Sequence, residues 1–98
     1  MNTAILEALD QELVLNNRIQ VARSVAISSA TTAVLMKTQS EFPETNLSDV
    51  VAGIAEEVAS AIDAMNPSTD ADYVVAGKFV AQQFCNSVAK KARDLRHG

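Results

Sequence analysis

The sequence predicts an all-α fold, an antiparallel bundle of three to four helices. Two apolar stripes step by three and four residues, one through 47–65 and one through 74–95, and only the helical repeat places such positions on one face. No segment alternates as a strand does, and neither Asn-Gly nor Asp-Gly occurs. Proline-containing breaks at 41–46 and 66–70 have the length of loops between antiparallel helices. We therefore expect one domain, residues 1–98, with helical segments at 3–40, 47–65 and 69–96.

The first segment, 3–40, is too long for one partner helix to cover. Only Asn16-Asn17 interrupts its helical pattern, so we predict a bend or irregularity there. The alternative is that the first fifteen residues project and pack on another subunit. Three consecutive apolar residues, Leu13, Val14 and Leu15, cover most of a helix circumference and predict heavy burial. We expect residues 3–15 to join an oligomer interface.

The second segment begins after Asn46, whose side chain is suited to cap the helix by accepting from the amide three residues on. Its outer face is acidic and includes Glu56 and Glu57. Asn66-Pro67 ends it. The predicted inner face consists of Leu47, Val50, Val51, Ile54, Val58, Ile62 and Met65.

The third segment opens at Ser68 or Thr69, with Asp70 and Asp72 in its first turn. It closes among the bases Lys90, Lys91, Arg93 and Arg96. Acids at the start and bases at the end complement the helix dipole. The predicted core stripe consists of Val74, Gly77, Ala81, Phe84, Val88, Ala92 and Leu95.

Small residues crowd between Ala22 and Ala33 and allow two backbones to approach closely. Gly53 and Gly77 lie inside helical patterns, where glycine costs about 1 kcal/mol relative to alanine. We expect a close helix crossing at both glycines; the alternative is that they are tolerated without a packing role.

Composition favours self-association inside the cell. A chain of 98 residues buries roughly 60–70% of its unfolded surface, and its many alanines contribute little area each, so we expect a homo-oligomer. The single cysteine, Cys85, excludes an internal disulfide. The single cysteine fits reducing surroundings, so we predict a cytoplasmic location. We expect no signal peptide, because the N-terminus lacks a basic region and carries Glu7, Asp10 and Glu12. We expect no membrane contact, because the longest uncharged stretch, Ser24 to Met36, is too short and polar to cross a bilayer.

Charge divides the chain in two. Residues 1–72 hold three bases against eleven acids, whereas residues 73–98 hold five bases against one acid. The basic cluster Lys90, Lys91, Arg93 and Arg96 has the chemistry to contact nucleic-acid phosphates, and the acidic face with Glu56 and Glu57 has the chemistry to dock on a basic partner. The plainer interpretation of both is a solvated helix face.

Enzymatic chemistry is not predicted. His97 is the only histidine and sits beside the last residue, where it makes a poor general base. Glu56 and Glu57 point about 100° apart on a helix and do not form a facing pair. Cys85 falls on the apolar stripe, where a thiol packs as a small hydrophobe. We expect no catalytic residue, no metal site and no cofactor.

The hypothesis that remains is a non-enzymatic protein–protein interaction module or regulator, acting as a homodimer or larger assembly with a protein partner. Its candidate surfaces are the segment Leu13 to Leu15, the acidic face, and the aromatic pair Tyr73 and Phe79. The aromatics stand off the predicted stripe and either anchor an interface or pack on the first segment. The alternative function is a small nucleic-acid-associated regulator that uses the basic end of the third helix.

Overall fold

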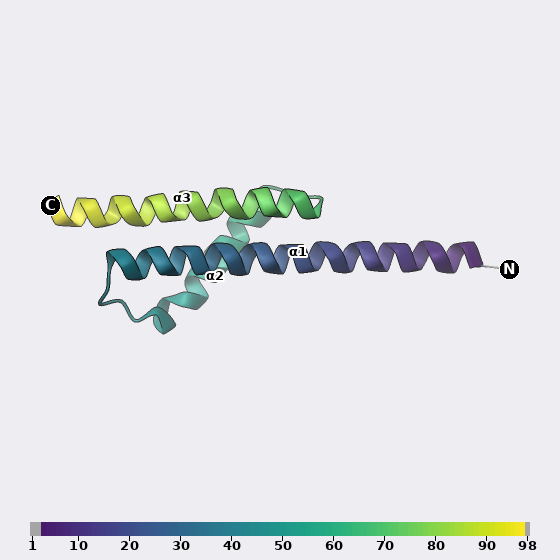
Figure 1. Cartoon of the computed structure of the whole chain (residues 1–98), viewed down its shortest axis with the longest axis horizontal. Helices are drawn as coiled ribbons and strands as arrows, with labels where there is room; N and C mark the ends of the chain where they lie inside the picture. The colour runs from purple at the N-terminus through teal and green to yellow at the C-terminus, as the bar shows by residue number, and fades with distance from the viewer. Residues whose placement is uncertain (1–2, 98) are drawn as a thin grey trace.

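The computed structural model describes residues 3–97, which form three α-helices joined by short loops (Figure 1). Helix α1 spans Thr3–Glu41, α2 spans Leu47–Ala64 and α3 spans Asp70–His97. No strand occurs among these residues. The all-α prediction is confirmed, and each predicted boundary lies within one residue of the observed one.

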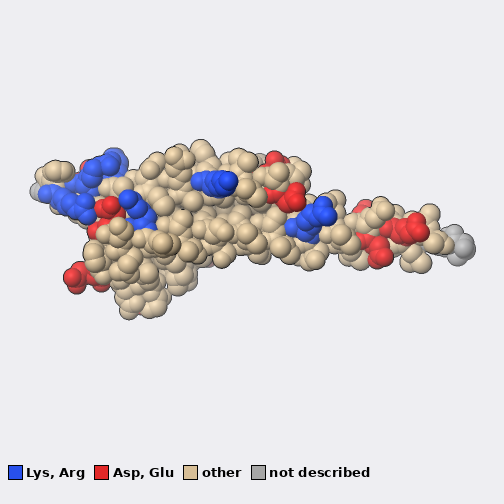
Figure 2. Space-filling view, in the orientation of Figure 1, with Lys and Arg blue, Asp and Glu red and all other residues tan. Residues whose placement is uncertain are grey.

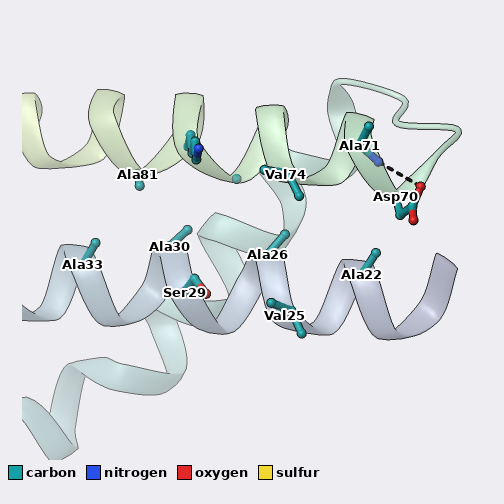
Figure 3. Close-up of a pocket in the computed structure, with 12 residues that line it drawn as sticks. Ala22, Val25, Ala26, Ser29, Ala30, Ala33, Asp70, Ala71, Val74 and Ala81 are labelled. Carbon is teal, nitrogen blue, oxygen red and sulfur yellow. Dashed lines mark hydrogen bonds between the residues drawn. The ribbon is translucent and has the colours of Figure 1, made fainter. Parts of the chain in front are cut away.

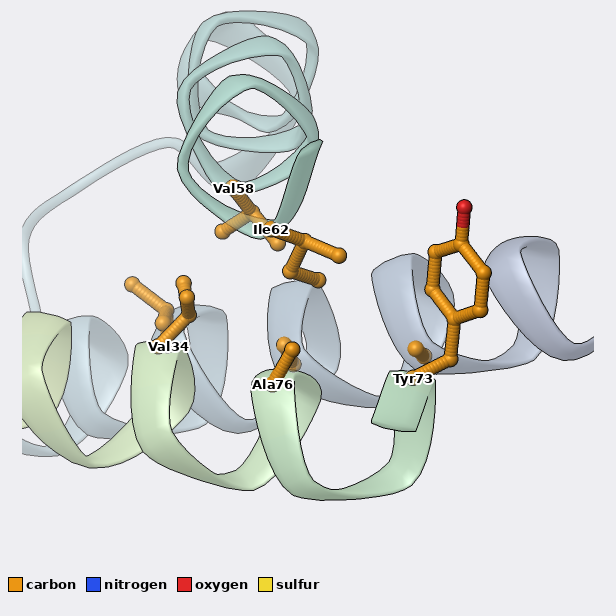
Figure 4. Close-up of a cluster of buried hydrophobic side chains, with 8 residues drawn as sticks. Val34, Val58, Ile62, Tyr73 and Ala76 are labelled. Atoms are coloured by element: carbon orange, nitrogen blue, oxygen red, sulfur yellow. The ribbon is translucent and has the colours of Figure 1, made fainter. Parts of the chain in front are cut away.

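Helices α1 and α3 lie side by side and run in the same direction (Figure 1). Gly77 lies beside Ala26, and Arg96 lies 3.0 Å from the carboxylate of Glu41, so residue numbers rise together along the two helices. Their contact is the most extensive of the three helix pairs. Helix α2 runs back obliquely across one face of the pair (Figures 1 and 4). The chain reverses at each loop, as predicted, but α2 crosses the pair instead of lying along it.

Helix α1 is continuous, so the predicted bend at Asn16-Asn17 is wrong. Sharp kinks require proline, a glycine–serine pair or a bulge, and residues 3–41 contain neither proline nor glycine. Asparagine in a helix costs only about 0.7 kcal/mol or less relative to alanine. The helix therefore continues through both asparagines.

Residues at the predicted positions begin and end the helices. Asn46 Oδ1 accepts from the amide of Ser48 at 3.2 Å, two residues on and not three as predicted. After α2, Asn66 takes a left-handed φ of 54°, which stops the helix before Pro67. Thr69 Oγ1 accepts from the amide of Asp72 at 3.0 Å and caps α3.

The core lies where α2 crosses the α1–α3 pair (Figure 4). Val58 and Ile62 of α2 are fully buried against Val34 of α1 and Ala76 and Val80 of α3. Of the predicted inner face of α2, only Val58 and Ile62 reach full burial.

The buried face of α3 overlaps the predicted stripe but is wider on one side. Gly77 and Ala92 are buried and Ala81, Phe84 and Val88 pack against the core, as predicted. Val74 and Leu95 are instead exposed, and Tyr73, Ala76 and Val80 are buried. The two stripes overlap and both are apolar, so spacing alone does not distinguish them. Gly77 belongs to both and lies against α1, where an added Cβ would lie 3.1 Å from the Cβ of Ala26.

Only one of the two predicted glycine crossings exists. Gly77 makes the close approach, but a Cβ at Gly53 would meet nothing within 4 Å. The prediction for Gly53 is therefore wrong, because α2 turns that position to solvent.

Candidate interaction surfaces

The first surface is the arm, which we define as residues 3–18 of α1. It projects past the beginning of α3 (Figure 1), and every residue in it is exposed. Leu13, Val14 and Leu15 are 66%, 60% and 52% exposed. The heavy burial predicted for them does not occur within one chain, because neither α2 nor α3 extends that far.

The second surface is a groove of about 640 Å³ between α1 and α3 (Figure 3). Small side chains line most of it, including Ala26 and Ala30 from α1 and Gly77 from α3. Val25 and Val74 stand at its edges and are more than half exposed. In Figure 3, α2 lies behind the pair, so it leaves the groove open. The groove was not predicted, although the crowding of small residues between Ala22 and Ala33 signalled the close helix pair that forms it.

The aromatic pair does not form one surface. Tyr73 is 8% exposed and belongs to the core, whereas Phe79 is 51% exposed. Of the two roles open to Tyr73, the structure places it in packing within the chain, so it is not an exposed anchor. Phe79 remains a candidate contact on the outer face of α3.

The acidic face of α2 is partly neutralised by the chain itself. Glu56 and Glu57 are exposed and form no ion pair with the described residues. Asp63 instead accepts two hydrogen bonds from Arg23, at 2.9 and 2.7 Å. These hydrogen bonds lower the pKa of Asp63 and raise that of Arg23. Among the described residues, the carboxylates of α2 that form no ion pair are thus Asp49, Glu56 and Glu57.

The basic end of α3 has both free and engaged cations. Lys90, Lys91 and Arg93 are exposed, and positive side chains gather at this end of the molecule in Figure 2. Arg96 instead contacts the Glu41 carboxylate at 3.0 Å and donates to its backbone carbonyl at 3.4 Å.

Glu41 links the ends of α1 and α3. Its carboxylate lies 3.3 Å from the ammonium of Lys37 as well as 3.0 Å from Arg96. The hydrogen bond from Lys37, followed by the charge of Arg96, lowers the pKa of Glu41. Two of the bases at this end are therefore already paired.

Groups with chemical reactivity are not assembled into one site. The Cys85 thiol is half-buried and donates to the carbonyl oxygen of Ala33 at 3.6 Å. His97 is the last residue of α3 and is exposed. Among residues 3–97, no group of three His, Cys, Asp or Glu side chains is placed to hold a metal ion.

Helix α1 is the one helix in the described chain that is long and apolar enough to cross a membrane. Its qualifying 18-residue window has a mean hydropathy of 1.3 and is 22% buried. The core helix of a soluble protein and a signal sequence meet the same criterion, so this is weak evidence on location. The cytoplasmic location remains a prediction.

Comparison with known proteins gives no relative from which a function can be transferred: no protein-family model, curated protein or solved structure matches this chain.

Proposed function

We propose that this chain is a non-enzymatic helical interaction module that acts as a homodimer or larger assembly. The observation that supports it is the excess of exposed surface. The chain exposes 6910 Å², whereas a compact 10.4 kDa protein exposes about 5,400 Å². Its radius of gyration is 18.0 Å, against about 13 Å for a compact chain of this length.

Much of the excess surface is apolar and lies on helices. The arm exposes six large aliphatic side chains, and the groove between α1 and α3 exposes Val25 and Val74. Contiguous apolar surface on a small protein marks an interaction site. Helices with an apolar face bind other helices, so partners with amphipathic helices are the class we propose.

Light scattering across a hundredfold range of protein concentration tests the assembly. We expect a particle mass of at least two chains at the upper end. A mass of one chain throughout would contradict the proposed homo-oligomer. Capture of interacting proteins from the source cell would then test a partner of different sequence, with Val25→Asp and Val74→Asp together as the variant expected to lose binding through the groove.

A second candidate function is nucleic-acid association through the exposed bases Lys90, Lys91 and Arg93. Three such cations per chain make at most a few phosphate contacts, and the net charge of −4 opposes binding. Salt-dependent retention on heparin, lost when the three bases become glutamate, would support this function. The matched control reverses two exposed bases elsewhere, Arg18 and Lys78, and is compared with reversal of Lys90 and Lys91, which makes the same change in net charge.

A further inference from the structure

The arm carries one half of a helix seam. Leu6, Leu9, Leu13 and Asn16 follow the alternating spacing of three and four residues that coiled coils use; we call these four residues the arm seam. The three leucines are 65%, 51% and 66% exposed. The spacing of these large side chains is suited to packing against a second helix, and neither α2 nor α3 packs on them.

The same seam is covered farther along α1. Continuing its spacing leads past the exposed Gln20 to Arg23, Ile27, Ala30 and Val34. Ala30 and Val34 are buried, Ile27 packs against the core, and Arg23 is bound to Asp63 of α2. From Arg23 onward the seam is therefore covered by α2 and α3, whereas none of the other described residues covers residues 3–18.

Two observations favour a second copy of this chain as the partner of the arm seam: the area that each chain exposes and the symmetry of the seam about its centre. Each chain exposes about 1,500 Å² more than a compact protein of its mass, and a stable interface needs about 800 Å² from each partner. The uncovered length, 3–18, has its centre near residue 11. An antiparallel pair of arm seams also centres at residue 11, since Leu9 then faces Leu13 and Leu6 faces Asn16 of the other copy.

The direction follows from the position of α2. In a parallel pair, the seam of each α1 would continue into the region where α2 already lies, from Arg23 bound to Asp63 onward. The two α2 helices would then have to occupy the same space between the α1 helices. In an antiparallel pair, residue 3 of one copy lies opposite residue 19 of the other, so the two arms overlap only up to residue 19. The overlap therefore stops before α2 begins to cover the seam.

We propose that two copies pair through their arm seams as an antiparallel helix pair, with a two-fold axis beside residue 11 and Leu9 of each copy against Leu13 of the other. This inference rests on the proposed self-association and names its partner and contact. The groove between α1 and α3 stays open in this dimer, because the arm seam ends at Asn16 and the α1 residues that line the groove begin at Ala22.

This arrangement has an electrostatic signature. Asp10 and Glu12 flank the arm seam on its two edges. The two-fold axis brings Asp10 close to Asp10 of the other copy, and Glu12 close to Glu12 of the other copy. Like charges at such edges weaken association, and salt screens them. Association therefore tightens as salt increases. A parallel pair would place Asp10 near Ile5 and would lack this effect.

Cysteine cross-linking tests the register. In a Cys85→Ser background, Leu9→Cys and Leu13→Cys variants are prepared separately and then mixed under mild oxidation. We expect a disulfide-linked dimer from the mixture and little from either variant alone. Cross-linking of each variant alone, without a mixed product, would establish a parallel pair and overturn the inference while leaving self-association intact.

Sedimentation equilibrium supplies a test without cysteine. We expect Glu12→Gln to lower the dimer dissociation constant by roughly threefold at low salt, and Glu7→Gln, the matched control on the far side of the arm, to leave it unchanged. Circular dichroism checks that each variant keeps its helix content. If the dissociation constant is unchanged by Glu12→Gln and no cross-link forms, the dimer uses another surface. That result overturns the arm-seam pairing but leaves the proposed homo-oligomer intact. A monomer at every concentration overturns both the inference and the proposed homo-oligomer.

Discussion

Gly77 of α3 sits directly on Ala26 of α1: a Cβ built at Gly77 would lie 3.1 Å from the Cβ of Ala26 and 3.4 Å from its backbone carbonyl oxygen. Both residues are buried. Backbone atoms of α1 form part of the contact, and they cannot move aside as a flexible side chain would. A larger side chain at Gly77 would therefore clash. This pair sets the spacing of the two parallel helices and thereby the width of the groove beside them.

Replacing Gly77 with valine should separate α1 from α3. The branched side chain has to push against the backbone at Ala26, and overpacking of this kind costs about 1–3 kcal/mol. We expect the free energy of unfolding, measured by urea denaturation, to fall by about 2 kcal/mol. Unchanged stability would show that the helices do not meet at this glycine.

Replacing Gly53 with alanine should have the opposite effect. Among the described residues, no atom beyond the adjoining backbone of α2 lies within 4 Å of the added Cβ, so the substitution gains helix propensity without a clash. We expect the free energy of unfolding to rise by about 1 kcal/mol. The same urea titration measures it, and a loss of stability would contradict the open environment of Gly53.

Replacing Thr31 with valine should also stabilise the fold. Thr31 is buried, and its hydroxyl has no hydrogen-bond partner among residues 3–97. Valine keeps the β-branched shape and removes the unsatisfied polar atom, which costs about 1 kcal/mol or more when buried. We expect a gain of about 1 kcal/mol. Thr32→Val, at the exposed neighbouring position, is the control and should show no gain.

The sequence predicted the helices well because their boundaries depend on local chemistry. Asn46, Thr69 and Pro67 act within a few residues of themselves, and the structure uses the first two as caps. The position of α2 across the pair depends instead on side chains that meet from three helices, such as Ile62 with Val34 and Ala76. No local pattern encodes that meeting.

The candidate surfaces were predicted less well for a related reason. An apolar residue at Leu13 and one at Tyr73 look alike in a sequence, yet the first is 66% exposed and the second 8%. What separates them is where the neighbouring helix ends. The groove was missed because it is a property of two helices, and the bend at Asn16-Asn17 was wrong because length alone does not force a helix to break.

Stability should fall in acid. The backbone and side-chain hydrogen bonds from Ser68 lower the pKa of Asp72, as Arg23 does for Asp63 and Lys37 for Glu41. A carboxyl whose pKa is lower in the folded chain than in the unfolded chain stabilises the fold at pH values above its unfolded pKa, which is about 4. This contribution disappears as the pH falls through the pKa of the folded chain.

Urea denaturation at pH 7 and at successive values below 4 measures this loss. We expect stability to decline over that interval and Asp72→Asn to be less stable at pH 7 with a shallower decline. A variant with the same slope as the unmodified chain would show that the cap of α3 does not titrate.

A comparison of Leu13 with Ile62 separates folding of the chain from its association. Ile62 is fully buried, so Ile62→Ala should lower the free energy of unfolding by about 2–5 kcal/mol at every protein concentration. Leu13 touches no other helix in its own chain, and alanine is a good helix former, so Leu13→Ala should leave stability at low concentration within about 0.5 kcal/mol. At high concentration the unmodified chain should gain melting temperature through association, because a partner that binds only the folded state stabilises it, and Leu13→Ala should lose that gain. Equal concentration dependence in both chains would place the self-association surface away from the arm.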